Sequence, residues 1–429
     1  MTAIDNNSDG LSQLGFSAAR VDRLRAWLDH QVSSERYAGV SLLLGRYGKR
    51  AFFHAAGYAD AERKRPFEEA TLARIYSMTK PVTSVAAMML YEENCFQLDD
   101  PVEHYLPEFR DMHVWRGGNA GIDDTVPANA PPTVRQIMTH TAGLTYGFMR
   151  ANVVDEAYRD ADLEFPGAHG SLAENVERLA ALPLLCQPGQ GWNYSVSTDV
   201  LGRLVEIWSG QSLNQFFDER IFKPLGMMDT GFSVSPGEEA RFAACYAPKS
   251  GKTLGGIGQR ASVTKPDDVL GYRLQDDPQT SPFLNAPSLY SGGGGLISTA
   301  PDYERFCRCL LNGGELDGVR LLGPRTLRYM RTNQLPDNRD MAAMGQPVWS
   351  ETSYEGIGFG LGFAVVLDPV SAAFITSVGE HHWGGAASTF FWLDPEEDLY
   401  AVFLAQLIPS SAYPVRRELR SLVYASLIN

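Results

Sequence analysis

The first sixty residues carry a helical hydrophobic pattern followed by two strand-like ones. Residues 17–33 place apolar side chains at helical spacing, which predicts an amphipathic helix with Ser17 at its N-cap. The apolar runs 39–45 and 51–57, separated by a polar turn, predict a β-hairpin. The chain is therefore expected to open with a helix and two strands.

Helical patterns dominate the middle of the chain, from about residue 77 to 290. Long connections rich in Pro, Gly and Asn, such as 116–132, separate them. The hydrophobic spacing predicts helices over 80–93, 133–139, 173–181, 197–208 and 213–221. We therefore expect a mainly helical region between the two ends of the chain.

Strand-like patterns return in the last third. Small and apolar residues alternate over 358–367, and the runs 388–393 and 399–404 flank a turn of Asp, Pro and Glu residues. A terminal helix is predicted over 411–427. Because strands occupy both ends and helices the middle, the pattern predicts an α+β fold with one antiparallel sheet assembled from both termini.

Length, charge and cysteine content narrow the class of protein. A chain of 429 residues is too long for one small core and predicts two packed regions. The net charge of −14 disfavours nucleic acid and anionic membranes as partners. Neither a signal-peptide pattern nor an apolar run of about 18 residues is found. The five cysteines form no Cys-x-x-Cys pair, so we expect a cytoplasmic protein with free thiols.

Ser77 and Lys80 have the spacing Ser-x-x-Lys, which makes Ser77 a candidate nucleophile. If Ser77 opens a helix, Lys80 lies one turn later on the same face. A serine hydroxyl attacks poorly until a base accepts its proton, and a lysine with a lowered pKa can be that base. At a helix N-terminus, the Ser77 N–H can also donate to a developing oxyanion.

The setting of this motif resembles serine β-lactamases, penicillin-binding proteins and family VIII carboxylesterases. In these proteins Ser-x-x-Lys begins a central helix, and here it leads into the apolar run 85–90. Further segments that look like this family follow in order: 94–109, 137–144, 223–227 and 291–296. The resemblance extends from about residue 20 to the end of the chain.

A tyrosine motif is the second element of the resemblance. Tyr194 lies in Pro-Gly-Gln-Gly-Trp-Asn-Tyr-Ser-Val, which is similar to the family's motif and makes Tyr194 the catalytic tyrosine. A phenol beside a lysine ammonium has a lowered pKa and can take or give a proton. A core tyrosine with a satisfied hydroxyl is the alternative, which the Pro-Gly lead-in and the upstream Ser77 motif disfavour.

The third element is His-Trp-Gly-Gly-Ala at 382–386. β-Lactamases carry Lys-Thr-Gly on this strand, whereas family VIII esterases typically carry Trp-Gly-Gly. By resemblance, the N–H groups of Ala386 and Ser77 form the oxyanion hole. Trp383 then provides an apolar wall of the substrate site, and Gly384 and Gly385 let a substrate approach closely.

Two departures from the β-lactamase pattern bear on the substrate. Trp383 replaces a lysine that would bind the carboxylate of a β-lactam, and Val196 replaces an asparagine that would hold its amide. Both losses leave the acyl-transfer residues in place. We therefore expect a serine carboxylesterase that acts on neutral, short-chain esters, with β-lactamase activity weak or promiscuous.

The resemblance also implies the overall organisation. It predicts a β-lactamase-like fold with an α/β domain of 1–85 and 286–429, a mainly helical domain of 86–285, and the active site at their interface. No cofactor and no metal are expected, and the expected partner is a small-molecule ester. The sequence leaves the oligomeric state and the natural substrate open.

Other interpretations of the sequence involve different chemistry. Gly-x-Ser-x-Gly is absent, which disfavours an α/β-hydrolase, and His381 and His382 lack a second ligand pair for a metal. We expect His140 to buttress its turn, and Asp199 either to orient polar groups or to act as a helix cap or surface residue. An acyltransferase that uses an acceptor other than water, a D-aminoacyl peptidase or β-lactamase, and a non-catalytic binding protein remain alternatives. The last is disfavoured because Ser77, Lys80 and Tyr194 are all present.

Overall fold

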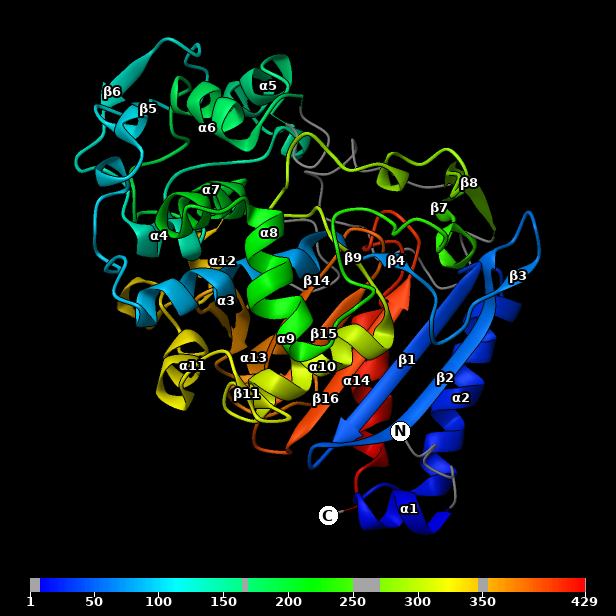
Figure 1. Cartoon of the computed structure of the whole chain (residues 1–429). Helices are drawn as coiled ribbons and strands as arrows, with labels where there is room; N and C mark the ends of the chain where they lie inside the picture. The colour runs from blue at the N-terminus through cyan, green and yellow to red at the C-terminus, as the bar shows by residue number, and fades with distance from the viewer. Residues whose placement is uncertain (1–7, 164–168, 250–270, 346–353, 429) are drawn as a thin grey trace.

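The computed structural model describes residues 8–163, 169–249, 271–345 and 354–428. An 8-stranded sheet in the order β12-β13-β14-β15-β16-β1-β2-β3 lies at its centre, and neighbouring strands pair antiparallel. Figure 1 shows the blue N-terminal strands beside the orange and red C-terminal strands. The prediction of an α+β fold with one antiparallel sheet built from both termini is therefore confirmed.

The strands of this sheet are β1 (Gly39–Arg46), β2 (Lys49–Asp60), β3 (Arg65–Pro66), β12 (Ile357–Phe359), β13 (Ala364–Val366), β14 (His381–Gly384), β15 (Phe390–Asp394) and β16 (Leu399–Ala405). Shorter pairs are β4 (Ala73–Arg74) with β9 (Ile297–Ser298), β5 (His113–Trp115) with β6 (Thr125–Pro127), β7 (Cys245–Pro248) with β8 (Tyr272–Asp276), and β10 (Glu315–Leu316) with β11 (Val319–Arg320). The α-helices are α1 (Ser8–Gln13), α2 (Ala18–Ser33), α3 (Thr79–Glu92), α4 (Val134–Met138), α5 (Val153–Asp160), α6 (Leu172–Ala180), α7 (Ser197–Ser209), α8 (Leu213–Phe217), α9 (Lys223–Leu225), α10 (Ala300–Leu311), α11 (Pro324–Met330), α12 (Met341–Met344), α13 (Pro369–Ala372) and α14 (Val415–Ser426).

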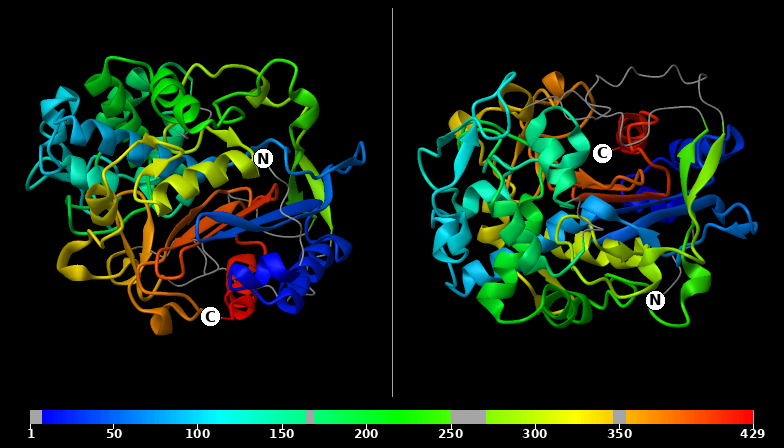
Figure 2. Two further views of the ribbon diagram at one scale, coloured as in Figure 1. Left: turned by 60° about the horizontal axis from the view of Figure 1, so that its bottom comes forward. Right: turned by 90° about the horizontal axis from the view of Figure 1, so that it is seen from above.

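Helices cover both faces of the sheet, which explains why its central strands β15, β16 and β1 are buried throughout. Successive side chains of a strand point to opposite faces. In β1, Leu42 and Leu44 join the cluster formed with α2 and α14, whereas Leu43 joins the larger cluster that contains α3 and α10. Figure 2 shows α2 and α14 on one side of the sheet and α10 on the other. All eight residues of β1 are consequently buried.

The helices of the middle of the chain lie beside one end of the sheet, around α3 (Figures 1 and 2). Residues 79–90 of α3 are all buried, so this part of the helix is covered on every side, and α7 is one of the elements that pack against it. Thr133 with Gln136 forms a capping box at α4, and Ser171 with Glu174 forms one at α6. These caps satisfy N–H groups of the first turn and fix where the two helices begin.

Two of the predicted elements take a different form in the structure. The single strand predicted over 358–367 is wrong, because the chain forms the hairpin β12–β13 there. The turn passes so close to α11 that a Cβ on Gly360 would lie 2.1 Å from the Met330 carbonyl oxygen. The helix predicted over 213–221 is α8 followed by a π-helical turn, Asp218–Phe222. The domain boundaries near residues 85 and 286 stay a prediction.

Among the described residues there is neither a membrane-spanning helix nor a metal-binding cluster, and the cysteines there are free. Within 8–163, 169–249, 271–345 and 354–428, no helix is both long and apolar enough to cross a bilayer. The same residues contain no group of three or more His, Cys, Asp or Glu side chains placed to hold a metal ion. The free cysteines are Cys95, Cys186, Cys245, Cys307 and Cys309.

Candidate active site

Ser77 lies in a short 3₁₀ turn, η1 (Tyr76–Met78), which joins β4 directly to α3. Tyr76 has a φ of 43°, a left-handed conformation that is uncommon for a residue with a side chain. This sharp turn places Ser77 at the N-terminal end of the buried helix α3. Lys80 lies in the first turn of α3, as the Ser-x-x-Lys spacing predicts.

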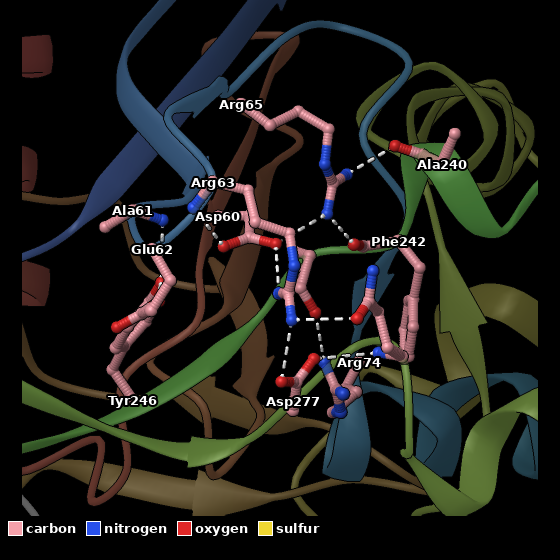
Figure 3. A network of polar contacts seen from close by, with 12 residues as sticks. Asp60, Ala61, Glu62, Arg63, Arg65, Arg74, Ala240, Phe242, Tyr246 and Asp277 are labelled. Carbon is pink, nitrogen blue, oxygen red and sulfur yellow. Dashed lines mark hydrogen bonds and ion pairs between the residues drawn. The ribbon is translucent and has the colours of Figure 1, made fainter.

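The strand that leads to Ser77 is held by Arg74, whose side chain is fully buried. Its guanidinium forms an ion pair with Asp276 at 2.7 Å. Figure 3 shows Arg74 beside a charged network in which Arg63, from the turn between β2 and β3, pairs with Asp277 at 2.8 Å. Because a buried guanidinium is costly without its partner, these contacts fix the position of β4 and so of Ser77.

The structure brings Ser77, Lys80 and Tyr194 together from three segments of the chain. The Tyr194 hydroxyl donates to Ser77 Oγ at 2.6 Å, and Lys80 Nζ lies 3.3 Å from the same oxygen. Lys80 Nζ is also 4.7 Å from the centroid of the Tyr194 ring. Lys80 is only 2% exposed and Tyr194 7% exposed, so the interaction lies largely out of water.

Lys80 has two further partners that the sequence analysis missed. Its ammonium donates to the Tyr146 hydroxyl at 2.9 Å and to the Gly293 carbonyl at 2.6 Å. Burial raises the pKa of Tyr146 well above its usual value, and the nearby Tyr194 and Asp199 raise this pKa further. Tyr146 is therefore a neutral phenol at ordinary pH. In the sequence, the signal that could have pointed to Tyr146 is its position just after segment 137–144, which resembles the family.

Asp199 is buried beside this cluster on α7, so the interpretation as a surface residue is wrong. Its Oδ1 accepts hydrogen bonds from Ser291 Oγ at 2.6 Å and from the Gly293 N–H at 3.0 Å. Burial raises the pKa of the Asp199 carboxyl, and the charge of Lys80 opposes that shift. Asp199 thus orients polar groups next to Lys80, which is one of the roles expected for it.

His140 supports the loop that carries Tyr194. Its imidazole Nδ1 lies 3.0 Å from Ser195 Oγ, and its carbonyl accepts from the Asn193 N–H at 2.9 Å. Burial and the charge of Lys80 lower the pKa of His140 well below its usual value, so the ring is neutral. This arrangement agrees with the buttressing role expected for His140.

Trp383 lies in β14, and its indole packs beside Tyr194 and Phe359. Its ring centroid is 5.4 Å from that of Tyr194 and 5.3 Å from that of Phe359. Within the described part of the chain, its indole N–H has no hydrogen-bond acceptor. Val196, at the start of α7, is completely buried. Substrate-binding roles for Trp383 and Val196 stay predictions.

The two glycines after Trp383 make room for protein atoms. A Cβ on Gly385 would lie 2.2 Å from the Ile75 carbonyl oxygen, and a Cβ on Gly384 would lie 2.4 Å from an Arg416 nitrogen. The missing side chain of Gly385 lets the end of β14 approach the segment that precedes Ser77. The substrate-binding roles expected for Gly384 and Gly385 stay predictions.

The expected oxyanion donors lie on these two adjoining segments. Ala386 follows Gly385 in a turn, and both Ala386 and Ser77 are half-buried. Outside helices and strands, the described residues show no hydrogen bond from either N–H to a backbone carbonyl. The role of these two N–H groups as oxyanion donors stays a prediction.

His382 lies beside a buried ion pair, whereas the imidazole Nδ1 of His381 lies 3.2 Å from the Gly379 carbonyl oxygen. His382 Nδ1 lies 2.9 Å from Glu380, which also forms an ion pair with Arg420 of α14 at 2.7 Å. Burial lowers the pKa of His381 to about 4 and also lowers the pKa of His382. The ion pair fixes β14 to the C-terminal helix.

Comparisons with known proteins agree with this architecture. A family model described as Beta-lactamase matches residues 24–425. Esterase EstB of Burkholderia gladioli is 32% identical over 428 residues, which cover 95% of this chain and 96% of EstB. The solved structure of EstCE1, described as a hydrolase with promiscuous acyltransferase activity, has a TM-score of 0.73 at 26% identity and covers 98% of this chain and 99% of its own. Simvastatin synthase LovD of Aspergillus terreus has a TM-score of 0.75 at 23% identity over 95% of this chain and 98% of LovD, which shows a shared fold.

The fold, the site and these comparisons define a serine hydrolase with a β-lactamase-like architecture. The chain belongs to the β-lactamase family, and within the superfamily of serine β-lactamases and penicillin-binding proteins it is of the family VIII esterase type.

Proposed function

We propose that this protein hydrolyses short-chain carboxylic esters through an acyl-enzyme on Ser77. The observation that carries this proposal is that Ser77 Oγ lies within hydrogen-bond distance of both the Tyr194 hydroxyl and Lys80 Nζ. A serine with two proton-transfer groups in contact is the arrangement that nucleophilic catalysis requires. The similarity to Esterase EstB along nearly the whole chain supports esters as the substrate class.

Acylation begins when Ser77 Oγ attacks the ester carbonyl carbon. The hydroxyl proton passes to the Lys80–Tyr194 pair, and the carbonyl π electrons move onto the oxygen. The N–H groups of Ser77 and Ala386 hold this oxyanion. The intermediate then collapses by breaking the bond to the alkoxy group, which takes the proton and leaves as an alcohol.

Deacylation repeats these steps with water as the nucleophile. The Lys80–Tyr194 pair accepts a proton from water, which attacks the acyl carbon. Collapse of the second intermediate breaks the bond to Ser77 Oγ. The serine oxygen regains its proton, and the carboxylic acid is released.

The absence of a lysine at position 383 supports a preference for neutral esters. A β-lactam carboxylate placed beside Trp383 would have no cation at that position, and an unpaired charge is costly where water is excluded. A neutral ester requires the oxyanion donors and an apolar wall, which the indole of Trp383 can form. We therefore expect kcat/KM for p-nitrophenyl butyrate to exceed that for nitrocefin.

Two measurements test the proposal. A phosphonate inhibitor should add once, on Ser77, as read by intact-mass and peptide mass spectrometry. Ser77→Ala should lose about 10³-fold or more in kcat on p-nitrophenyl butyrate, whereas Ser421→Ala, on the exposed side of α14, should keep full activity. An adduct on another serine, an active Ser77→Ala variant, or a large preference for nitrocefin would refute the assignment.

Acyl transfer to an alcohol or amine is the second candidate. The description of EstCE1 as a hydrolase with acyltransferase activity favours it, since both reactions pass through the same acyl-enzyme. Product analysis with added alcohol distinguishes the two. A hydrolase yields mainly the free acid, whereas a transferase yields mainly the new ester.

A further inference from the structure

A buried carboxylate lies behind the proposed catalytic lysine. Asp199 is 0% exposed and comes from the first turn of α7, whereas Lys80 comes from α3. Its Oδ1 accepts two hydrogen bonds, but its Oδ2 has no hydrogen-bond partner among the described residues. A half-satisfied buried carboxylate is destabilising unless it has a function or a compensating charge.

Gly293 connects this carboxylate to Lys80. The Gly293 N–H donates to Asp199 Oδ1 at 3.0 Å, and the carbonyl of the same residue accepts from Lys80 Nζ at 2.6 Å. A Cβ on Gly293 would lie 2.4 Å from Asp199 Oδ2, so the glycine allows the carboxylate to approach its backbone. Ser291 Oγ holds the carboxylate from the other side. Asp199 thereby fixes the direction of the carbonyl that positions the ammonium.

Asp199 also affects Lys80 through its negative charge. The groups that face the ammonium from other elements are the phenols of Tyr146 and Tyr194, the hydroxyl of Ser77 and the imidazole of His140. His140 is neutral because burial and Lys80 lower its pKa. The opposite charge in this surrounding comes from Asp199, whose carboxyl pKa is raised by burial, a shift that the ammonium opposes. A buried negative charge close to an ammonium favours its protonated form.

We propose that Asp199 is a positioning residue for the catalytic unit: it holds the Gly293 carbonyl against Lys80, and its charge determines how tightly the Lys80–Tyr194 pair holds its proton. The inference rests on the proposed ester hydrolysis through Ser77. A residue with only a structural role would alter folding, but it would leave the pH at which the pair loses its proton unchanged.

Asp199→Asn tests this, because asparagine keeps the size and one acceptor oxygen and removes the charge. We expect the rising limb of the kcat/KM profile for p-nitrophenyl butyrate to move about 1 to 2 pH units toward acid. The value of kcat should fall about 10-fold or more, with KM within about 3-fold of the wild type. Asp302→Asn, which removes another buried carboxylate, is the matched control and should not move the limb.

Ser291→Ala is the second variant, for the case in which Asp199→Asn does not fold. It removes a hydrogen bond that favours the ionised carboxylate, so Asp199 binds a proton more readily and the limb should move the same way by a smaller amount. An unmoved limb in folded Asp199→Asn, or in Ser291→Ala when the first variant is unfolded, overturns the proposal. Thermal unfolding establishes which case applies. Failure of the proposed function itself gives a different result, because the wild type would then neither turn over the ester nor be labelled on Ser77.

Discussion

Removing Lys80 and Tyr194 singly and together measures whether they act as one proton-transfer unit. Both contact Ser77 Oγ, at 3.3 and 2.6 Å, and the ammonium lies 4.7 Å from the phenol ring centroid. In the proposed mechanism, the proton of Ser77 therefore moves within a group of three contacting side chains. We expect Lys80→Ala and Tyr194→Phe each to interrupt the same transfer.

The expected loss of kcat/KM follows from the usual contribution of proton-transfer catalysis. Loss of proton-transfer catalysis at such a site reduces kcat/KM by about 10³-fold. If the two residues acted independently, the double variant would lose about 10⁶-fold, whereas a single unit would still lose only about 10³-fold. The difference of about 10³-fold corresponds to a coupling free energy of about 4 kcal/mol.

The assay is the steady-state hydrolysis of p-nitrophenyl butyrate by the two single variants and the double variant. Thermal unfolding must show that all three are folded. Tyr146→Phe is the matched control, because it removes a phenol that contacts Lys80 at 2.9 Å and has no hydrogen bond to Ser77. It should lose about 10-fold or less. Losses that multiply in the double variant would show that Lys80 and Tyr194 have independent roles.

Two further predictions concern specificity and stability. Trp383→Lys should shift the ratio of kcat/KM values toward nitrocefin or lower both activities; a gain in p-nitrophenyl butyrate turnover would contradict the apolar-wall role. Burial raises the pKa of Asp302 to about 6. Its contribution to folding is therefore present at acid pH and is lost as the pH rises through about 6, by roughly 2 to 3 kcal/mol. Asp302→Asn should remove this slope in urea unfolding between about pH 4 and pH 7, and parallel curves for the two proteins would argue against it.

The sequence predicted the parts of the fold that have strong local signals. The helix 17–33 and the hairpin that follows correspond to α2, β1 and β2, because amphipathic spacing and a polar turn mark them. Helix α10 was missed, although Thr299 caps it and Pro301 lies in its first turn. The alternation of small and apolar residues continues through the glycines of the β12–β13 hairpin. The sequence therefore predicts one strand where the chain forms two.

In the candidate site, too, the residues that lie on sequence motifs could be predicted, and the residues that lie outside motifs could not. Ser77, Lys80 and Tyr194 lie on motifs, so their spacing and the family resemblance suggested that they would meet. Tyr146 lies 66 positions from Lys80 and belongs to no spacing rule. The Gly293 carbonyl is a backbone group, which has no signature in a sequence. In the sequence, Asp199 is a candidate only because it follows Tyr194 closely along the chain. The tertiary contacts show that it lies behind Lys80.

The environment of Lys80 explains how a buried ammonium is tolerated and why its surroundings bear on catalysis. An ammonium has three donors, and here Ser77 Oγ, the Tyr146 hydroxyl and the Gly293 carbonyl accept them. In the proposed mechanism, two of these acceptors remain unchanged during the reaction, whereas Ser77 Oγ becomes an ester oxygen when the enzyme is acylated. The ammonium therefore keeps its position through Tyr146 and Gly293 while the reacting oxygen changes. Because Gly293 is in turn held by Asp199, the proposed control of the position and charge of the lysine comes from a fully buried residue.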